Sequence, residues 1–242
     1  MMMNYHFEYK GVQAMKDIVI SLFDRTGNWS RPYLEAGYTV YQIDIQNEIQ
    51  TDVMTWNYRK IPKERVWCVL AAVPCTDFAY SGEEWFPLKD RDGRTAKSCA
   101  LVKKTMEIIN YFNPEVWCIE NPKGRIRVLN PEIGQVKCIF QPYQYAGYNE
   151  VNPDNDRYPK ETWLYGEFTV PYTSPLPMLS KYRKTKWKDE FISEVSPIGS
   201  QELKNLRSVT PMGFAIAFYR VNEQSVGKCP ISLGMKGKVL YV

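Results

Sequence analysis

The sequence predicts an α/β protein with a doubly wound, mostly parallel sheet, and three features of the chain carry this prediction. Short apolar segments alternate with helical patterns through the first two-thirds of the chain, which is typical of a parallel sheet with helices on both faces. The segment 66–73 is apolar throughout, as expected of a strand covered on both sides. Polar turn residues follow several of these segments directly, so we expect ligand-binding loops at the carboxyl ends of the strands.

The first elements follow from local patterns. Three short segments rich in apolar and β-branched residues predict strands at 17–23, 38–45 and 66–73. A helix is expected over 30–37, because Ser30 suits its N-cap and Gly37 its C-terminal stop.

A longer amphipathic helix is expected over 95–112. Its apolar residues recur at steps of three and four, at Cys99, Val102, Met106 and Ile109. Pro114 ends this helix. Later strands are expected at 115–120, 135–140 and 162–168, and a last helix at 212–222. The tail after that helix carries no clear pattern.

The organisation changes after residue 168. The following stretch holds several prolines and the basic run KYRKTKWK, so we expect an irregular basic insertion over 169–206 rather than another strand and helix. The chain then divides into a main domain, 1–168, this insertion, and a C-terminal helix and tail, 207–242, that complete the main domain.

Composition narrows the chemistry. The chain has 242 residues, of which 24% are charged, with a net charge of +4, a mild bias toward anionic partners. It shows no apolar leader and no run long enough to span a bilayer, so we expect a cytoplasmic protein without a membrane partner. The six cysteines form no CxxC pair and His6 is the single histidine. We therefore expect no metal site and no histidine-based catalysis.

The loop after the first strand, FDRTGNWS, has the composition of a ligand cradle. Gly27 lets the backbone approach a ligand closely, and Asp44 ends the second strand twenty residues after Asp24. Such folds place an acid there for ribose hydroxyls. Asp52 lies further along. A turn followed by one acid and then another, in this order along the chain, favours a nucleoside-cofactor pocket over the interpretation that these are ordinary turn and strand-end residues.

Two further loops carry reactive groups. Pro74-Cys75 leaves the third strand into a polar loop, where a thiol near amide donors becomes a nucleophile. The other cysteines in apolar runs read as small core residues. Glu120-Asn121 is expected to begin the turn after the strand at 115–120, where an acid and an amide together can recognise a hydrogen-bonding edge.

These blocks together resemble the DNA (cytosine-5)-methyltransferase family. AAVPCTDFAYSG resembles its Pro-Cys block, IENPKGR its Glu-Asn block, FDRTG its cofactor loop, and RSVTPMGFAIAFYR its C-terminal block. The likeness spans roughly 17–168 and 207–220. It implies a Rossmann-like S-adenosylmethionine-dependent methyltransferase fold, and the short insertion suggests a small phage-type member with a reduced target-recognition region.

The resemblance implies a mechanism on double-stranded DNA. The Cys75 thiolate attacks C6 of a flipped cytosine, Glu120 protonates or hydrogen-bonds N3, and Asn121 positions the Cys75 loop or the base. Asp44 holds the ribose of S-adenosylmethionine and Asp52 the adenine. The full set of cofactor residues it implies is Phe23, Asp24, Thr26, Gly27, Asn28, Trp29, Asp44, Ile45, Asp52, Val53, Pro74 and Thr210.

One departure concerns the base-contacting arginine of the family's Gln-x-Arg-x-Arg strand. Gln141 matches its first residue, but no arginine pair follows. Arg157, Lys160 and Thr162 are the candidates to replace it, and Lys160 is grouped with the catalytic residues Cys75, Glu120, Asn121 and Pro74. The expected nucleic-acid contacts are Ser81, Arg125, Thr162, Lys181, Arg183, Lys184 and Lys186.

The loop 81–95 is expected to close over the flipped base. Trp85 or Phe86 would then fill the vacated stack, although both also suit a role as surface anchors of the loop. Two alternatives stay open: the same chemistry on a free pyrimidine nucleotide or RNA, and an inactive relative that binds cofactor or DNA. A monomer is favoured.

Overall fold

A computed structural model describes residues 16–180, 208–223 and 238–240. Its centre is a seven-stranded sheet in the order β5-β6-β4-β3-β1-β2-β7. The strands are β1 (Ile18–Leu22), β2 (Thr39–Ile43), β3 (Val66–Ala71), β4 (Val116–Pro122), β5 (Val136–Phe140), β6 (Thr162–Glu167) and β7 (Lys238–Leu240).

The strand order makes the sheet doubly wound. The pairs β1–β2, β1–β3, β2–β7 and β3–β4 are parallel, and β6 is antiparallel to both β4 and β5. After β2 the chain returns across β1 to form β3 on its other side. The crevice outside the carboxyl ends of β1 and β3 is therefore the topological switch point, where such sheets bind ligands.

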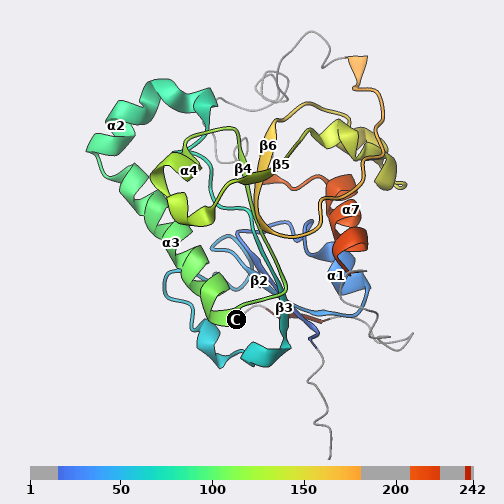
Figure 1. Cartoon of the computed structure of the whole chain (residues 1–242), viewed down its shortest axis with the longest axis horizontal. Helices are drawn as coiled ribbons and strands as arrows, with labels where there is room; N and C mark the ends of the chain where they lie inside the picture. Colours follow the sequence, from blue (N-terminus) through green and yellow to red (C-terminus); the bar gives the residue numbers. More distant parts are fainter. Residues whose placement is uncertain (1–15, 181–207, 224–237, 241–242) are drawn as a thin grey trace, which may run out of the picture.

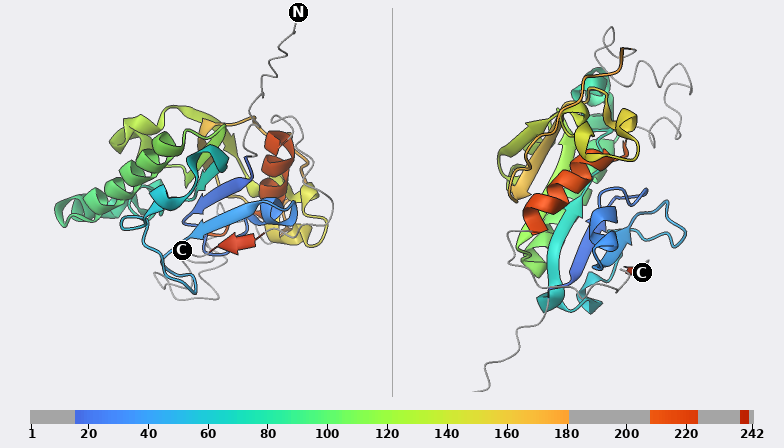
Figure 2. Two further views of the ribbon diagram at one scale, coloured as in Figure 1. Left: turned by 90° about the horizontal axis from the view of Figure 1, so that it is seen from below. Right: turned by 90° about the vertical axis from the view of Figure 1, so that its right-hand side faces the viewer.

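Helices cover both faces, as the sequence predicts (Figure 1). Helix α3 (Arg94–Phe112) packs Val102, Ile108 and Phe112 on one face of the sheet. The other face is covered by α1 (Arg31–Glu35) and α7 (Met212–Glu223), and Figure 2 shows α7 lying across the strands. The doubly wound α/β fold is confirmed.

Two elements differ from the prediction. The stretch 81–95, expected to be a loop, is mostly helical: the 3₁₀ helix η3 (Tyr80–Trp85) runs into α2 (Phe86–Arg91). Pro87 stands in the first turn of α2, where its fixed φ favours a helix and its missing N–H costs nothing. The tail was expected to have no pattern, but it contributes β7, which pairs in parallel with three residues of β2.

A third correction concerns the Glu-Asn block. Glu120 and Asn121 lie inside β4, not in the turn that follows it. Parallel pairing of β4 with β3 ends at Ile119, but antiparallel pairing with β6 continues to Pro122. The antiparallel neighbour therefore keeps both residues in an extended, hydrogen-bonded conformation.

The remaining elements are short. They are α4 (Ile126–Leu129) and the 3₁₀ helices η1 (Tyr58–Lys60), η2 (Lys63–Arg65), η4 (Pro131–Ile133), η5 (Pro142–Gln144), η6 (Ala146–Tyr148) and η7 (Pro153–Asp156). Residues 169–179 contain no helix or strand, in keeping with the irregular stretch expected there.

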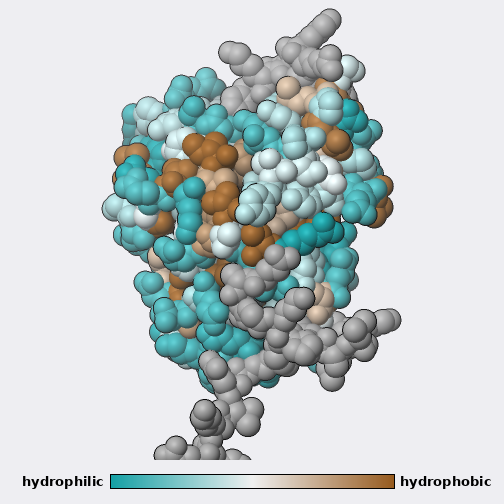
Figure 3. All heavy atoms as spheres, turned by 45° about the vertical axis from the view of Figure 1, so that its right-hand side comes forward, coloured by the Kyte–Doolittle hydropathy of each residue, from teal (hydrophilic) through white to brown (hydrophobic). Residues whose placement is uncertain are grey.

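The face shown in Figure 3 is mostly hydrophilic, with several apolar patches among the polar side chains. Large apolar side chains that are exposed include Ile45, Ile49, Met54, Trp85, Val128 and Val151. Within the described ranges, no helix is both long enough and apolar enough to cross a membrane.

Candidate active site

The loop after β1 begins with an unusual backbone. Phe23 has a φ of 60°, in the left-handed region that non-glycine residues seldom occupy, and its N–H donates to Ile43 O at 2.8 Å. Gly27 has a φ of 67°, and a Cβ there would lie 3.1 Å from Gln42 Oε1. These two residues turn the chain sharply at the switch point, as a ligand cradle requires.

Asp24 is held inside this loop. Its Oδ2 accepts hydrogen bonds from Ser21 Oγ and Ser30 Oγ, both at 2.9 Å, and from Ser30 N at 3.2 Å. Burial raises the pKa of Asp24, and the bonds from Ser21 and Ser30 oppose that rise. The carboxyl of Asp24 therefore stabilises the turn from within.

Trp29 is also directed inward. It is fully buried, and its ring lies 6.1 Å from Phe214 and 6.0 Å from Phe218 of α7. The structure thus places Trp29 in the core beneath the loop, where it joins α7 to the sheet.

Arg25 occupies the middle of the loop and stands out. Its Nε is buried and has no hydrogen-bond partner within the described residues. Its charge lowers the pKa of Asp44, although burial is the larger effect and raises that pKa overall. A buried guanidinium nitrogen without a partner is costly, so a bound anionic or hydrogen-bond-accepting group would suit this position.

The acids after β2 differ in their surroundings. Asp44 is partly buried and its Oδ1 accepts a hydrogen bond from Gln46 N at 2.8 Å. Ile45 beside it is 60% exposed. Asp52 is exposed and caps its own turn through Met54 N, whereas Val53 is buried in the core.

The C-terminal block reaches the same loop. Asn28 Nδ2 donates to Thr210 O at 3.2 Å, across 182 residues of sequence. Thr26 Oγ1 accepts from Asn28 N at 3.3 Å. Thr26, Asn28 and Thr210, all expected at the cofactor, therefore lie together on one side of the switch point.

The thiol block and the acid block meet through a side-chain hydrogen bond. Ala71 of β3 pairs with Ile119 of β4, so the segments that follow start side by side. Asn121 is fully buried, and its Nδ2 donates to Val73 O at 2.8 Å. This bond fixes the backbone two residues before Cys75, which is partly exposed.

Glu120 points toward a lysine. Its Oε1 lies 3.5 Å from Lys160 Nζ, and the two side chains are 12% and 20% exposed. Gln141 Oε1 accepts a hydrogen bond from Lys160 N at 2.6 Å, which holds the lysine backbone against the end of β5.

The other two candidates for the missing arginine are engaged elsewhere. Arg157 donates to Pro177 O and pairs with Asp154. Thr162 is buried, and its hydroxyl donates to Lys160 O. Among the three, the structure brings Lys160 alone to Glu120.

The expected nucleic-acid contacts divide into three groups. Ser81 is exposed in η3. Arg125 makes an ion pair with Asp90 and hydrogen bonds within the protein. Lys181, Arg183, Lys184 and Lys186 lie outside the described residues.

Sequence reasoning missed several residues of this region. Arg25 was not among the residues predicted for the loop, and Lys89 and Asp90 were missed because the stretch that contains them was expected to be a loop. The signal for these last two was the dense charge pattern KDRDGR. In the part of the chain that the structure describes, no cluster of three or more metal-binding side chains occurs.

Comparison with known proteins gives one sequence relationship. No protein-family model matches the chain. The probable DNA (cytosine-5)-methyltransferase of Frog virus 3 (isolate Goorha) is 27% identical over 145 residues; the match covers 54% of this chain and 66% of that relative. A solved structure assigned as a DNA modification methyltransferase, encoded within a prophage of E. coli, aligns with a TM-score of 0.42 and 15% identity over 66% of this chain and 52% of its own. The chain spans less than two thirds of that viral relative's length, and over this part it is similar to a probable DNA (cytosine-5)-methyltransferase, the family that its Pro-Cys and Glu-Asn blocks resemble.

Proposed function

We propose that the chain is an S-adenosylmethionine-dependent DNA cytosine-5 methyltransferase acting on double-stranded DNA. The observation that carries the proposal is the hydrogen bond from Asn121 to Val73 O. It ties the strand that bears Glu120 to the loop that bears Cys75, which supports the proposal that this acid and this thiol act on one base.

The residues at the switch point fit the cofactor. Arg25 offers an unpartnered buried donor, Asp44 a partly buried carboxylate for hydroxyl groups, and Ile45 an exposed apolar surface for an aromatic ring. Bound there, S-adenosylmethionine supplies an electrophilic methyl group.

In the proposed reaction, Cys75 loses its proton and attacks C6 of the cytosine. The ring electrons shift toward C5 and N3, and Glu120 meets the charge that develops at N3 with a proton or a hydrogen bond. General acid help of this kind is worth about 10²–10⁴-fold. C5 becomes electron-rich enough to accept the methyl group, and the Cys75 sulfur departs when the C5 proton is lost.

Lys160 is proposed to replace the family's base-contacting arginine. Its ammonium lies beside Glu120. In the proposed complex it would donate to O2 of the base that Glu120 holds, or to the phosphate of the same nucleotide. An arginine at this position would keep the positive charge and could add the bidentate contact that a lysine cannot make. We therefore expect a Lys160→Arg variant to retain activity and Lys160→Ala to lose most of it.

Access to C6 requires the base to leave the duplex, at a cost of a few kcal/mol. Trp85 is the better candidate to fill the vacated stack, because it is 53% exposed. Phe86 is engaged within the protein, with the Arg125 guanidinium 3.6 Å above its ring.

The test is covalent trapping on duplex DNA that contains 5-fluorocytosine, incubated with S-adenosylmethionine. Because fluorine replaces the hydrogen at C5, no proton can be lost there and the Cys75 sulfur is not released. The protein–DNA adduct therefore persists and is visible as a denaturation-resistant band. We expect the wild type and the Cys99→Ala control, which removes another partly exposed cysteine, to form the adduct and Cys75→Ala to form none.

Parallel reactions with fluorinated RNA and with the free nucleotide separate the rival substrates. Trapping with either of these and not with DNA would overturn the DNA assignment while retaining the chemistry. No adduct with any pyrimidine would overturn the enzyme itself.

A further inference from the structure

We propose that Arg125 is a positioning residue that latches the segment 76–95 against the Cys75 loop, in place of the DNA contact expected from the sequence. The effect on catalysis rests on the proposed function above. The latch itself is a property of the folded chain and can be measured without it.

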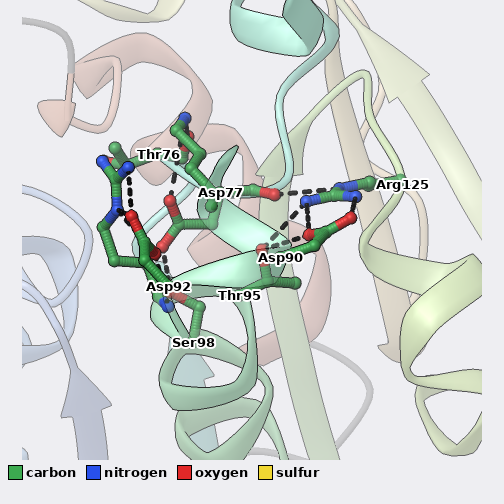
Figure 4. A network of polar contacts seen from close by, with 9 residues as sticks. Thr76, Asp77, Asp90, Asp92, Thr95, Ser98 and Arg125 are labelled. Carbon is green, nitrogen blue, oxygen red and sulfur yellow. Dashed lines mark hydrogen bonds and ion pairs between the residues drawn. The ribbon is translucent and has the colours of Figure 1, made fainter. Parts of the chain in front are cut away.

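The Arg125 side chain is committed to internal partners (Figure 4). Its Nε donates to Asp77 O at 3.1 Å, and its two terminal nitrogens donate to Asp90 Oδ2 at 2.9 Å and Asp90 Oδ1 at 2.6 Å. Nη2 also donates to Thr95 Oγ1 at 3.0 Å. These four hydrogen bonds use four of the five N–H donors of a guanidinium, and the side chain is only 13% exposed.

Asp90 and Thr95 are themselves joined, which closes the network. Thr95 Oγ1 donates to Asp90 Oδ1 at 2.6 Å. The bonds from Arg125 and Thr95 lower the pKa of Asp90 to about 2, so the carboxylate is charged at neutral pH. One acid on α2 thus receives both a bidentate arginine from the Glu-Asn block and a hydroxyl from α3.

The ring of Phe86 packs against the guanidinium of Arg125. The guanidinium carbon lies 3.6 Å from the centroid of this ring, within the range of a cation–π contact. The first residue of α2 therefore packs against Arg125, and Asp90, one turn later, pairs with it.

The backbone of the same block is joined to the thiol segment. Arg125 N donates to Phe78 O at 2.8 Å, and Tyr80 N donates to Lys123 O at 3.1 Å. Between them Ala79 and Gly124 form an isolated antiparallel bridge. A Cβ at Gly124 would collide with Phe78 O, so the two segments approach as closely as only glycine permits.

A second anchor holds the residues next to the thiol. Lys89 of α2 is buried, and its Nζ donates to Thr76 O at 2.5 Å and lies 3.7 Å from Asp77 Oδ1. Ser98 Oγ of α3 donates to Asp77 Oδ2 at 2.6 Å. The residue after Cys75 is thus fixed from α2, and α2 is fixed by Arg125.

This arrangement predicts what removal of the latch does. Without Arg125, α2 loses its bidentate partner and the Lys89 anchor loses its support, so the thiol is positioned less well against Glu120. Misplacement of a reacting group by about 1 Å can cost about 10²-fold in rate. A phosphate contact behaves differently: its loss weakens DNA binding and lowers the salt slope by about 1.

The experiment compares Arg125→Gln with Arg127→Gln, which removes the same charge two residues further along. Amide hydrogen exchange of 78–92 is measured first, on protein alone. We expect faster exchange in this segment for Arg125→Gln and none of that change for Arg127→Gln. Unchanged exchange in Arg125→Gln would overturn the latch, whatever the protein catalyses.

The second readout is adduct formation with fluorinated duplex, with DNA affinity measured over a range of salt concentrations. The latch predicts a tenfold or greater fall in the trapping rate of Arg125→Gln at saturating DNA, with the salt slope unchanged. Arg125→Lys is expected to restore only part of the rate, because it cannot form the bidentate pair. A salt slope lowered by about 1 with a normal trapping rate would overturn the positioning role in favour of a phosphate contact.

Asp90→Asn guards against a general folding defect, since its side chain is 49% exposed. It removes the partner and leaves Arg125 in place. It is expected to reproduce the exchange and rate defects of Arg125→Gln, and the double variant is expected to be no worse than either single one. Additive defects would overturn the pairing. If the wild type itself forms no adduct, the proposed function fails and the exchange comparison still decides the latch.

Discussion

Replacement of Asn121 by alanine separates the stability of the site from its geometry. Asn121 is fully buried, its Nδ2 donates to Val73 O at 2.8 Å, and its Oδ1 has no partner within the described residues. Asn130 offers a matched control. It is equally buried, its Nδ2 donates to Ile126 O at 2.9 Å, and its Oδ1 likewise has no partner there.

The stability cost is expected to be of the same order for both variants and smaller for Asn130→Ala, because Ile126 O keeps the hydrogen bond from Asn130 N at 2.9 Å. Loss of the amide leaves a buried carbonyl without that donor, which costs about 1–3 kcal/mol. The alanine also removes an unpartnered Oδ1, which offsets part of the cost, so we expect a net loss of about 1–2 kcal/mol. For a chain of this size, that lowers the melting temperature by about 2–8 °C.

The rates are expected to diverge. Asn121→Ala frees the backbone before Cys75, and we expect a fall in the 5-fluorocytosine trapping rate of about 10²-fold. Asn130→Ala is expected to keep the wild-type trapping rate within about twofold, since surface and core changes away from the site act mainly on stability. Melting temperatures are measured by thermal denaturation, and the trapping rates of both variants are measured at one temperature well below either transition. Equal trapping rates for the two variants would refute the view that Asn121 positions the thiol loop.

Further predictions concern the cofactor, the DNA and pH. Arg25→Leu is expected to weaken S-adenosylmethionine binding in calorimetry at least tenfold, or about 1.4 kcal/mol. Arg59→Leu, at an exposed arginine outside the switch-point loop, is the control. Equal affinities of the two variants would count against Arg25 as a ligand donor. Trp85→Ala is expected to abolish the quenching of tryptophan fluorescence by duplex DNA, which a base stacked on that ring produces; full quenching in the variant would exclude Trp85 as the stacking residue. The bond to Arg125 lowers the pKa of Asp90, so the ion pair stabilises the fold above pH 4 and is lost as the pH falls toward 2. The gap in melting temperature between wild type and Asp90→Asn should therefore close over that range, and a constant gap would show that Asp90 does not contribute as an ion pair.

Much of the fold could be predicted because the signals are local. An apolar run such as 66–73 predicts a strand covered on both faces, and the three- and four-residue spacing of Val102, Met106 and Ile109 predicts the helix that covers it. The strand β7 escaped prediction because three residues carry too little pattern, and its partner β2 is almost two hundred residues away in the chain. Its pairing depends on the edge that β2 presents, which local sequence does not encode.

The site was less predictable for a related reason. Sequence blocks identify Cys75 and Glu120 as chemical groups, but the contacts that join their segments run through residues without a motif. The bond from Asn121 to a backbone carbonyl and the ion pair of Arg125 with Asp90 depend on three-dimensional proximity. Arg125 was expected among the nucleic-acid contacts, and only the packing of α2 reveals that most of its donors face inward.

The bridge between Ala79 and Gly124 has a consequence for how this chain can vary in length. The strands β3 and β4 join the two segments at their near ends, at Ala71 and Ile119, and the bridge joins them again at their far ends. Cys75 and Glu120 thus lie in two segments that are joined to each other at both ends. An inserted or deleted residue in either segment would break one of these two joins, so natural length variation between them should be rare.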